Sequence, residues 1–264
     1  MNERAASDST PLLSVTVIAK NEADRMGRLL PSVAFADEVV VIDSGSTDDT
    51  VEICRQAGAT VLYHDWMGYA RQKQLALETA RGSWVLCLDA DEAVSPEAQQ
   101  EILAAVKNSP EHVVAYSLPR LSRYLNRWIR HGGWYPDRKV RLVRRGHGKW
   151  VGDGIHEKLE VSGAVMELRN PLLHYVYRDI SDQIATINRF SSVAADAANG
   201  PASGWYVIAG VFHAIGKFLE CAVWKLGILD GIPGLVIAMN SAFYVFVRHA
   251  KCWERSIAGE RRNQ

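Results

Sequence analysis

The chain has 264 residues, of which 48% are hydrophobic and 23% charged, so it can bury one good-sized core with an appendage and has an ordinary globular composition. Its formal net charge is zero, which excludes nucleic-acid binding driven by bulk charge. The four cysteines include no CxxC pair, so we expect no metal cluster or disulfide framework and favour a reducing, cytoplasmic setting. Residues 1–11 are polar and lack the apolar run of a signal peptide, so we expect a loose lead-in to the first strand.

The first 110 residues alternate short apolar runs with helical patterns. In chain order they predict a strand over 12–19, a helix over 21–33, a strand over 38–42, a helix over 50–57, a strand over 60–63, a helix over 69–80, a strand over 84–88 and a helix over 96–107. Ser95 as N-cap and Pro96 at the first helical position mark the start of the last helix. The alternation predicts an α/β fold with a mostly parallel sheet and helices on both faces. Ligands bind such sheets at the carboxyl ends of the strands.

The middle of the chain changes character. We expect a strand over 113–118, a helix over the basic and aromatic segment 120–130, and a strand over 139–144, where basic and apolar residues alternate. A glycine-rich turn over 152–157, extended structure over 165–177 and a helix over 182–198 complete this part.

Segment 199–204 contains glycine, proline and serine and is the best linker in the chain. An apolar tail follows, in which 205–229 is interrupted by three charged residues and 232–247 is shorter than the ~20 residues that a membrane-spanning helix needs. Basic residues come next, so we expect apolar helices that lie on an anionic membrane surface; a helical subdomain packed on the rest of the chain and a dimer interface are the alternatives. These basic residues are Arg248, Lys251, Arg255, Arg261 and Arg262.

Asp89-Ala90-Asp91 is the sharpest chemical feature. Two carboxylates directly after a buried strand form a compact oxygen site, which suits Mg²⁺ or Mn²⁺ sharing its shell with diphosphate oxygens and water. Such an ion acts as a Lewis acid when a nucleotide diphosphate departs. The triplet alone is a weak signal, and an exposed loop that caps a helix is the alternative.

Polar residues follow two other predicted strands on the same rim. Asp43 ends the strand over 38–42, where a carboxylate accepts hydrogen bonds from a base or ribose in nucleotide-binding folds. The alternative is an Asx-turn at Asp43 with Asp48 as a helix cap. Lys20-Asn21-Glu22 follows the first strand, and its alternative is an ordinary helix start with an acidic first turn. No GxGxxG or GxxxxGK[ST] motif follows any strand, so a dinucleotide site and a P-loop are disfavoured.

Taken together, these stretches resemble the family 2 glycosyltransferases, which have the GT-A fold. The resemblance rests on SVTVIAKNE over 14–22, VVVIDSGSTD over 39–48 and LDADE over 88–92, in order over the first half of the chain. A more diffuse set is similar to a bacterial branch that adds glucose or a similar sugar to the lipopolysaccharide inner core: GWYP over 133–136, VRLVRR over 140–145, IHE over 155–157, His174-Tyr175 and LDG over 229–231.

The resemblance implies roles for these residues. Asp43 would contact the uracil or ribose of a UDP-sugar, Asp89 would lie near the ribose or the metal, and Asp91 would ligate Mg²⁺ or Mn²⁺. The nucleotide-sugar site would also include Lys20, Asn21, Glu22, Ser44 and Asp48. The family inverts the anomeric centre in one displacement, which needs a carboxylate to take the proton of the acceptor hydroxyl.

Two carboxylates are candidates for this base. Glu157 lies in a glycine-flanked loop, where the backbone can approach a ligand closely, and is preferred; Asp137 stands just before the basic strand. A surface turn with an ion pair to Lys158 is the alternative for His156-Glu157. His174 is a further possible metal ligand, with a buried strand histidine as the favoured alternative.

The basic strand and its aromatic neighbours also offer ligand contacts. Arg141, with Arg138, Arg144 and Arg145, would grip the donor diphosphate or an anionic acceptor; a solvated strand face is the alternative. Trp128, Trp134 and Tyr135 would stack on sugar rings, or else belong to the core.

We therefore expect a GT-A catalytic domain over 1–198, with a donor-binding half over 12–110 and an acceptor half over 111–198, and a membrane-associating extension over 199–264. The expected protein is an inverting, metal-dependent hexosyltransferase at the inner face of the cytoplasmic membrane, acting on a lipid-linked saccharide. Transfer to another lipid or to a protein, nucleotidyl transfer, and a non-catalytic nucleotide-binding scaffold are the alternatives.

Overall fold

The computed structural model describes residues 11–152, 157–198 and 203–262, with side chains up to residue 257 in the last stretch. Residues 199–202 of the predicted linker and 153–156 of the predicted turn, including His156, lie outside the described residues. The chain forms two compact units. The sheet unit comprises Met1–Arg120 and Asp137–His174, and the helical unit comprises Leu121–Pro136 and Tyr175–Gln264.

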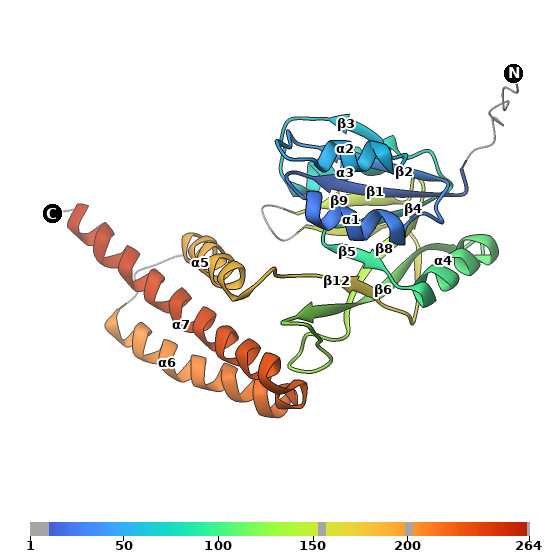
Figure 1. Ribbon diagram of the computed structural model, residues 1–264. Coiled ribbons are helices and arrows are strands. Elements are labelled where there is room, and N and C mark those ends of the chain that lie inside the picture. The colour runs from blue at the N-terminus through green and yellow to red at the C-terminus, as the bar shows by residue number, and fades with distance from the viewer. Residues whose placement is uncertain (1–10, 153–156, 199–202, 263–264) are drawn as a thin grey trace, which may run out of the picture. The chain divides into compact units, whose positions relative to one another are not determined.

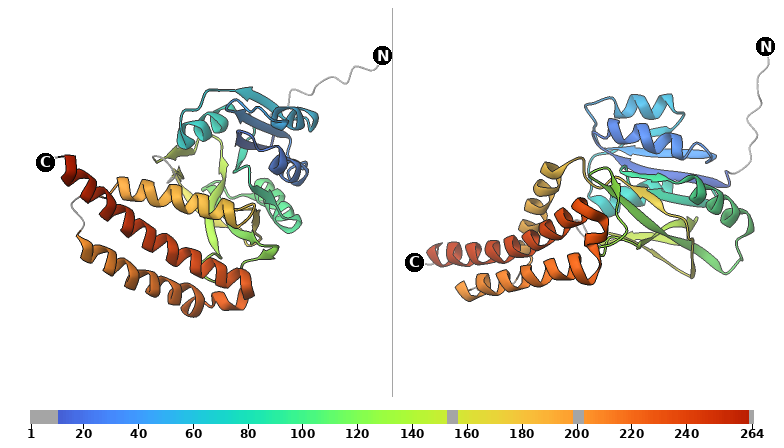
Figure 2. Two further views of the ribbon diagram at one scale, coloured as in Figure 1. Left: turned by 60° about the vertical axis from the view of Figure 1, so that its left-hand side comes forward. Right: turned by 60° about the horizontal axis from the view of Figure 1, so that its bottom comes forward.

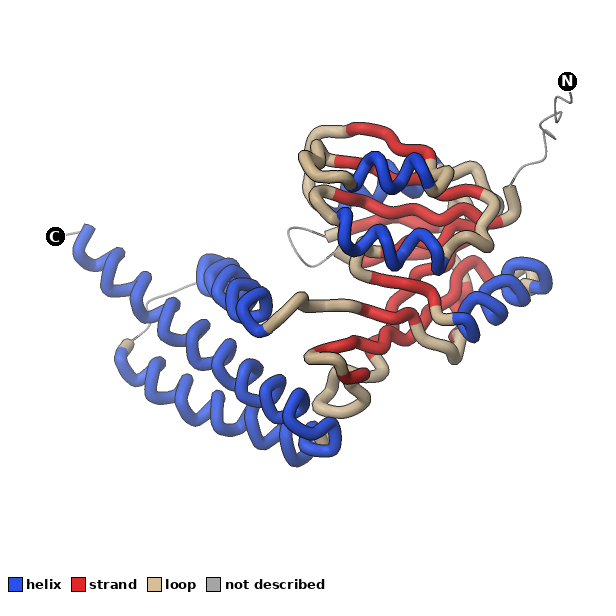
Figure 3. The backbone as a smooth tube through the Cα atoms, in the orientation of Figure 1, coloured by secondary structure: helices blue, strands red, loops and turns tan. Residues whose placement is uncertain are grey.

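The sheet unit is built on four parallel strands in the order β3-β2-β1-β4. Antiparallel pairing of β8 with β4 and of β6 with β8 extends the sheet, which continues through β12 to β5. Figures 1 and 3 show these strands with helices on both sides. The predicted α/β class, a sheet with helices on both faces and an apolar helical extension, is confirmed. The elements of this unit are β1 (Leu13–Ala19), α1 (Ala23–Ser32), β2 (Glu38–Asp43), α2 (Thr50–Gln56), β3 (Thr60–Tyr63), α3 (Tyr69–Thr79), β4 (Trp84–Leu88), β5 (Glu92–Val94), α4 (Pro96–Asn108), β6 (Val113–Tyr124, whose last four residues belong to the helical unit), β8 (Asp137–Arg144), β9 (Gly148–Val151), β10 (Lys158–Val161), β11 (Ala164–Glu167) and β12 (Leu172–His174).

The core has two layers because β1 presents alternate side chains to opposite faces of the sheet. Leu13, Val15 and Val17 pack with residues of α1, α2 and α4, whereas Ile18 packs with α3 on the other face. Side chains of β9 and β10 join α3 there. The helices therefore leave the carboxyl ends of β1, β2 and β4 at one open edge, where Ala19 pairs with Asp43 and Val17 with Leu88.

The prediction of a helix over 120–130 is wrong. Strand β6 continues to Tyr124, and β7 (Arg127–Trp128) pairs back on it in a hairpin. The turn residues Leu125 and Asn126 both have positive φ, at 45° and 62°, as a two-residue hairpin turn requires. Most side chains along β6 are buried, so strand packing outweighs the local helical preference of this basic segment.

The helical unit contains α5 (Ile180–Asp196), α6 (Gly204–Leu219) and α7 (Gly231–Arg262). A π-helix (Glu220–Trp224) and a 3₁₀-helix (Gly227–Asp230) connect α6 to α7, and the views in Figures 1 and 2 show these two helices side by side as a hairpin. Asp230, which is 2% exposed, anchors the bend because its carboxylate accepts hydrogen bonds from the backbone N–H groups of Arg130 and His131 at 3.0 and 2.8 Å.

We expected the apolar segment 232–247 to be too short to cross a membrane. This expectation is corrected, because the helix that contains it is longer than the segment. Two helical stretches, Gly204–Trp224 and Gly227–Ile257, are long and apolar enough to span a bilayer, judged by length and composition alone. Only 17% and 22% of their apolar windows are buried within the protein, so most of this apolar surface faces outward.

Candidate functional site

The Asp89–Asp91 segment lies at the open edge of the sheet, between the end of β4 and the start of β5. Its turn is closed by two short contacts: the Glu92 N–H donates to the Asp89 carbonyl at 2.9 Å, and the Glu92 carboxylate accepts from the Asp89 N–H at 3.0 Å. Glu92 is 1% exposed. The DxD segment is therefore a rigid connection that aims two carboxylates at the same edge.

Asp89 sits at the centre of a row of alternating charges, the charge cluster. Lys73 of α3 contacts Asp89 at 2.5 Å and Glu157 at 2.8 Å. Arg141 of β8 bonds to Asp89 and, at 2.7 Å, to Glu92. The cluster continues because Arg120 donates to Glu92 at 3.2 Å and to Asp137 at 3.0 Å. The structure thus brings both predicted bases into one network with the DxD motif.

The cluster shifts the pKa values of its members. Burial by itself raises the pKa of Asp89, but Arg141 and Lys73 outweigh it and hold that pKa far below its ordinary value. Burial likewise opposes the charged forms of Lys73 and Arg141, yet the neighbouring carboxylates raise both pKa values. Burial raises and Arg120 lowers the pKa of Asp137, and the net shift is downward. All these groups are charged at neutral pH.

Both carboxylate oxygens of Asp89 face cations of the protein, whereas Asp91 faces a histidine. The Asp91 carboxylate lies 3.5 Å from Nε2 of His174, the last residue of β12. Strand β12 pairs with β5 so that His174 stands opposite Glu92, which brings it to the DxD turn. Within the described ranges, no three His, Cys, Asp or Glu side chains group into a complete metal-binding set. A carboxylate and an imidazole suit an ion that takes most of its ligands from substrate and water, as Mg²⁺ and Mn²⁺ do.

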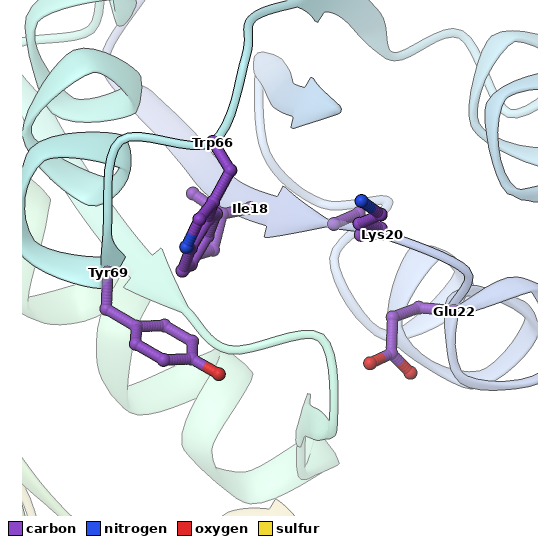
Figure 4. A pocket seen from close by; sticks show the side chains of 6 residues that line it. Ile18, Lys20, Glu22, Trp66 and Tyr69 are labelled. Atoms are coloured by element: carbon purple, nitrogen blue, oxygen red, sulfur yellow. The ribbon is translucent and has the colours of Figure 1, made fainter. Parts of the chain in front are cut away.

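A pocket of about 430 Å³ opens beside this edge (Figure 4). Lys20 and Glu22 line one side, and Trp66 and Tyr69 line the other, with Ile18 between them. The two aromatic rings meet edge to face, with centroids 4.8 Å apart. Aromatic rings opposite a cation are suited to a heterocyclic base attached to an anionic group. The sequence analysis identified Lys20 and Glu22 but missed both aromatic residues.

The loops after β1 and β2 are joined by hydrogen bonds. Several residues that were predicted to contact the nucleotide therefore bind other groups of the protein. The Asp43 carboxylate accepts from the N–H groups of Gly45 and Ser46 at 2.9 and 3.0 Å, in the Asx-turn arrangement that the sequence left open. Asn21 accepts from the Thr47 N–H at 2.8 Å. Asp48 accepts from the Thr50 N–H at 3.1 Å, and Ser44 accepts from the Gln72 side chain at 2.9 Å.

The four arginines predicted as ligand contacts in and just after β8 have different neighbours. Of these four, only Arg141 belongs to the charge cluster. Arg138 donates to the Leu168 carbonyl, Arg144 lies over the Trp84 ring with 4.6 Å to its centroid, and Arg145 is exposed. The solvated-face alternative therefore describes Arg138 and Arg145, whereas Arg144 packs on Trp84.

Lys73, Arg120 and Glu92 are members of the site that the sequence patterns did not indicate. Lys73 lies on α3 with its side chain only 8% exposed, and its ammonium is 4.7 Å from the centroid of the Trp150 ring. A lysine on the buried face of a predicted helix was the available signal, because such a residue is rarely buried without a partner. Arg120 was hidden by the mistaken helix over 120–130.

The model of the family described as "Glycosyl transferase family 2" matches residues 14–158, more than half of the chain and all of the DxD edge. This protein belongs to glycosyltransferase family 2. The glycosyltransferase is 29% identical over 262 residues to "Lipopolysaccharide core biosynthesis glycosyltransferase LpsC" of Rhizobium meliloti, with 95% of each chain covered. It is 40% identical over 259 residues to the uncharacterized glycosyltransferase RC0292 of Rickettsia conorii, covering 94% of this chain and 92% of that protein.

A solved structure supports the fold. The mannosyltransferase PcManGT of Pyrobaculum calidifontis, determined in complex with GDP-Man and Mn²⁺, superposes on this glycosyltransferase with a TM-score of 0.53. The two are 16% identical, and the match covers 94% of this chain and 89% of that chain. The GT-A arrangement is therefore shared at the level of the fold.

Proposed function

We propose that this glycosyltransferase transfers a hexose, glucose first among them, from a UDP-sugar to a lipid-linked saccharide of the lipopolysaccharide inner-core type, with inversion at the anomeric carbon. The observation that carries the proposal is the DxD turn, in which Asp89 is held by protein cations while Asp91 is directed to His174. The similarity to LpsC, whose name gives it a role in lipopolysaccharide core biosynthesis, supports the acceptor class.

The pocket beside β1 is the proposed donor site. The uracil would pack against Trp66 and Tyr69, and the Lys20 ammonium would pair with a phosphate. Asp43 and Asp48 hold the loops that shape this pocket. Their role in our proposal is to position Lys20 and its neighbours, and Asp43 contacts the nucleotide only through the remaining acceptor capacity of its carboxylate.

Asp91 and His174 are the proposed ligands of Mg²⁺ or Mn²⁺. When bound, the cation neutralises negative charge on the departing diphosphate. Asp89 has another role in this scheme: it fixes Lys73 and Arg141 at the edge, where their positive charge favours an anionic leaving group. The Mn²⁺ in the PcManGT complex is consistent with this assignment.

Glu157 is the proposed base. In the displacement the acceptor oxygen bonds to the anomeric carbon, the bond to the diphosphate breaks with its electron pair on the leaving group, and a carboxylate takes the acceptor proton. Asp137 is the weaker choice because Arg120 and Lys139 occupy its carboxylate and its pKa is lowered. Among the side chains that the structure describes, Glu157 pairs with one cation, Lys73, and its side chain is 16% exposed.

UDP release from UDP-glucose, with Mg²⁺ or Mn²⁺ and a truncated lipopolysaccharide acceptor, tests the proposal. We expect Asp91→Asn to lower turnover by about a hundredfold, the effect of losing a few kcal/mol of charge stabilisation. Glu111→Gln, which removes one exposed carboxylate away from the cluster, serves as the control. Unchanged turnover in Asp91→Asn would rule out the metal role.

The base is tested by a pair of variants. We expect Glu157→Gln to lower kcat by at least about a hundredfold while UDP binding, measured by calorimetry, stays as in the wild type. Asp137→Asn should retain most of the activity. The opposite ranking would assign the base to Asp137. Activity with another lipid or with a protein, and none with the lipopolysaccharide acceptor, would leave the family assignment unchanged and would replace the proposed acceptor.

An apolar stripe on α6 is the proposed membrane contact. Trp205, Ile208, Phe212, Ile215 and Leu219 repeat at intervals of three and four residues, so they lie along one face of the helix. Their exposed fractions run from 47% to 77%. Such a stripe, on a protein that acts on a lipid-linked acceptor, is suited to the interface of the cytoplasmic leaflet. The predicted membrane contact also included basic residues near the end of the chain. Of those whose side chains the structure describes, Lys251 and Arg255 bind α5, and Arg248 is exposed.

A further inference from the structure

The helical unit contains a cavity of about 270 Å³, close to the lower size of small-molecule sites. Its walls come from α5, α6, α7 and the loops before β8 and α5, and all the lining residues belong to this one unit. One wall is aromatic: Trp134 and Tyr177 line the cavity, and Tyr124 packs behind them with ring centroids 6.0 and 6.1 Å away. The rings of Trp134 and Tyr177 are inclined by 58° to each other, with centroids 6.3 Å apart, so they form an angled apolar lining.

Two amide side chains also line the cavity, those of Gln183 and Asn240. Gln183 is 4% exposed, and its side-chain carbonyl accepts from the Tyr124 hydroxyl and, at 2.5 Å, from the Asn240 side-chain nitrogen. These two bonds orient both amides and leave the Gln183 nitrogen and the Asn240 oxygen without a partner among the residues that the structure describes. Gln183 lines the cavity, so its N–H is accessible there and can donate to a polar group that binds in the cavity.

The charge of the cavity restricts what can bind. Lys217 is its one ionisable cation among the lining residues, and the carboxylate of Glu220 pairs with that ammonium at 3.0 Å. A phosphate or nucleotide would need an unpaired cation here. A donor and an acceptor side by side, in a cavity that aromatic rings also line, match instead the hydroxyl groups and the apolar face of a neutral sugar ring.

We infer that this cavity binds a neutral sugar unit of the saccharide acceptor, as a subsite separate from the donor pocket of the sheet unit. That the sugar belongs to the acceptor rests on the proposed function. The preference for a neutral sugar rests on the residues that line the cavity. Gln183 donates to a ring hydroxyl, Asn240 accepts from one, and Trp134 with Tyr177 stacks on the ring. Thr186, Ser241 and Tyr244 add hydroxyl groups at the cavity wall.

Two variants perturb the cavity in different ways. Gln183→Glu keeps an oxygen for Tyr124 and Asn240 but replaces the free donor with an acceptor. Thr186→Phe leaves those hydrogen bonds intact and fills the cavity with a ring. Ala185→Phe is the matched control, since it adds the same ring at the next position of α5, which is exposed and does not line the cavity.

The probe is the core oligosaccharide released from lipopolysaccharide by mild acid, titrated by calorimetry into the full chain in a detergent without a sugar head group. We expect both cavity variants to weaken binding by about tenfold and Ala185→Phe to bind as the wild type does. Saturation-transfer spectroscopy should place ring protons of the sugar against aromatic protons in the wild type and in Ala185→Phe, and should show a weaker transfer in the two cavity variants.

UDP binding is measured on the same samples, which separates the two proposals. Loss of UDP binding in every sample would overturn the proposed function and leave the sugar subsite to be judged on the oligosaccharide titration. Oligosaccharide binding that is absent, or equal in all four proteins, would overturn the subsite whatever UDP does. Competition by a fatty acid would also overturn it, because the cavity would then hold an acyl chain.

Discussion

Replacing Arg141 with methionine should destabilise this protein far more than the same change at Arg138, three positions earlier on the same strand. Methionine keeps much of the apolar stem and removes the guanidinium. Arg141 is 4% exposed and joins Asp89 to Glu92. Its loss leaves the buried Glu92 carboxylate with Arg120 as its partner, and leaves Asp89, whose side chain is 26% exposed, with Lys73 and, at 4.0 Å, Arg120. Breaking a buried ion pair in this way costs about 3–5 kcal/mol.

The lower end of that range applies, because each carboxylate keeps a partner. A loss of about 3 kcal/mol corresponds to a fall in Tm of roughly 6–12 °C for a domain of this size. Arg138 pairs with Glu167 at 3.3 Å with 32% of its side chain exposed, and exposed pairs contribute about 0–1 kcal/mol. Thermal and urea unfolding followed by circular dichroism at pH 7 measures both variants.

The pH dependence has a defined sign. The folded-state pKa of Asp89 is lowered, so its stabilisation is present above the unfolded pKa of about 4 and is lost as pH falls through the folded value. The gap between wild type and Arg141→Met should therefore be widest at pH 6–8 and narrow below about pH 4. Equal losses of stability in Arg141→Met and Arg138→Met, or a gap that widens in acid, would refute this account of the charge cluster.

Three further predictions concern the donor pocket, the membrane stripe and a helix cap. Trp66→Ala should raise KM for the UDP-sugar by about tenfold with kcat nearly unchanged, measured by steady-state UDP release, since it removes one face of the proposed base site. Phe212→Glu should abolish co-flotation with anionic vesicles, whereas Glu111→Gln on the sheet unit should float as the wild type does; equal flotation would rule out the stripe. Ser95→Ala should cost about 1 kcal/mol in urea unfolding because Ser95 accepts from the Ala98 N–H at 3.1 Å, and an unchanged midpoint would contradict the capping role.

The alternating part of the fold could be predicted from sequence because its signals are local. Strand β4 is a run of five buried residues, and α4 begins at the expected N-cap and proline. Segment 120–130 could not be predicted in this way. Its β-hairpin depends on β8, which follows it in the chain and pairs with β6, so the deciding contacts are not local.

The candidate site also combines residues with a local sequence signal and residues without one. Asp89 and Asp91 were recognisable because they follow a strand directly. Lys73 and His174 reach the site through the packing of α3 and the pairing of β12 with β5, neither of which leaves a motif. The spacing of the DxD motif also gave no sign that Asp89 would face two protein cations, since that depends on side chains 16 and 52 positions away.

Trp150 lies beneath the cluster, and this placement makes it an optical reporter of the site. Its ring has the Lys73 ammonium 4.7 Å from its centroid and the Arg141 guanidinium at 6.0 Å. Indole emission responds to nearby charge, so any ligand that draws these cations toward a diphosphate changes the field at this ring. Fluorescence of the unlabelled protein should then follow donor binding in real time, and a Trp150→Phe variant would identify the part of the signal that arises here.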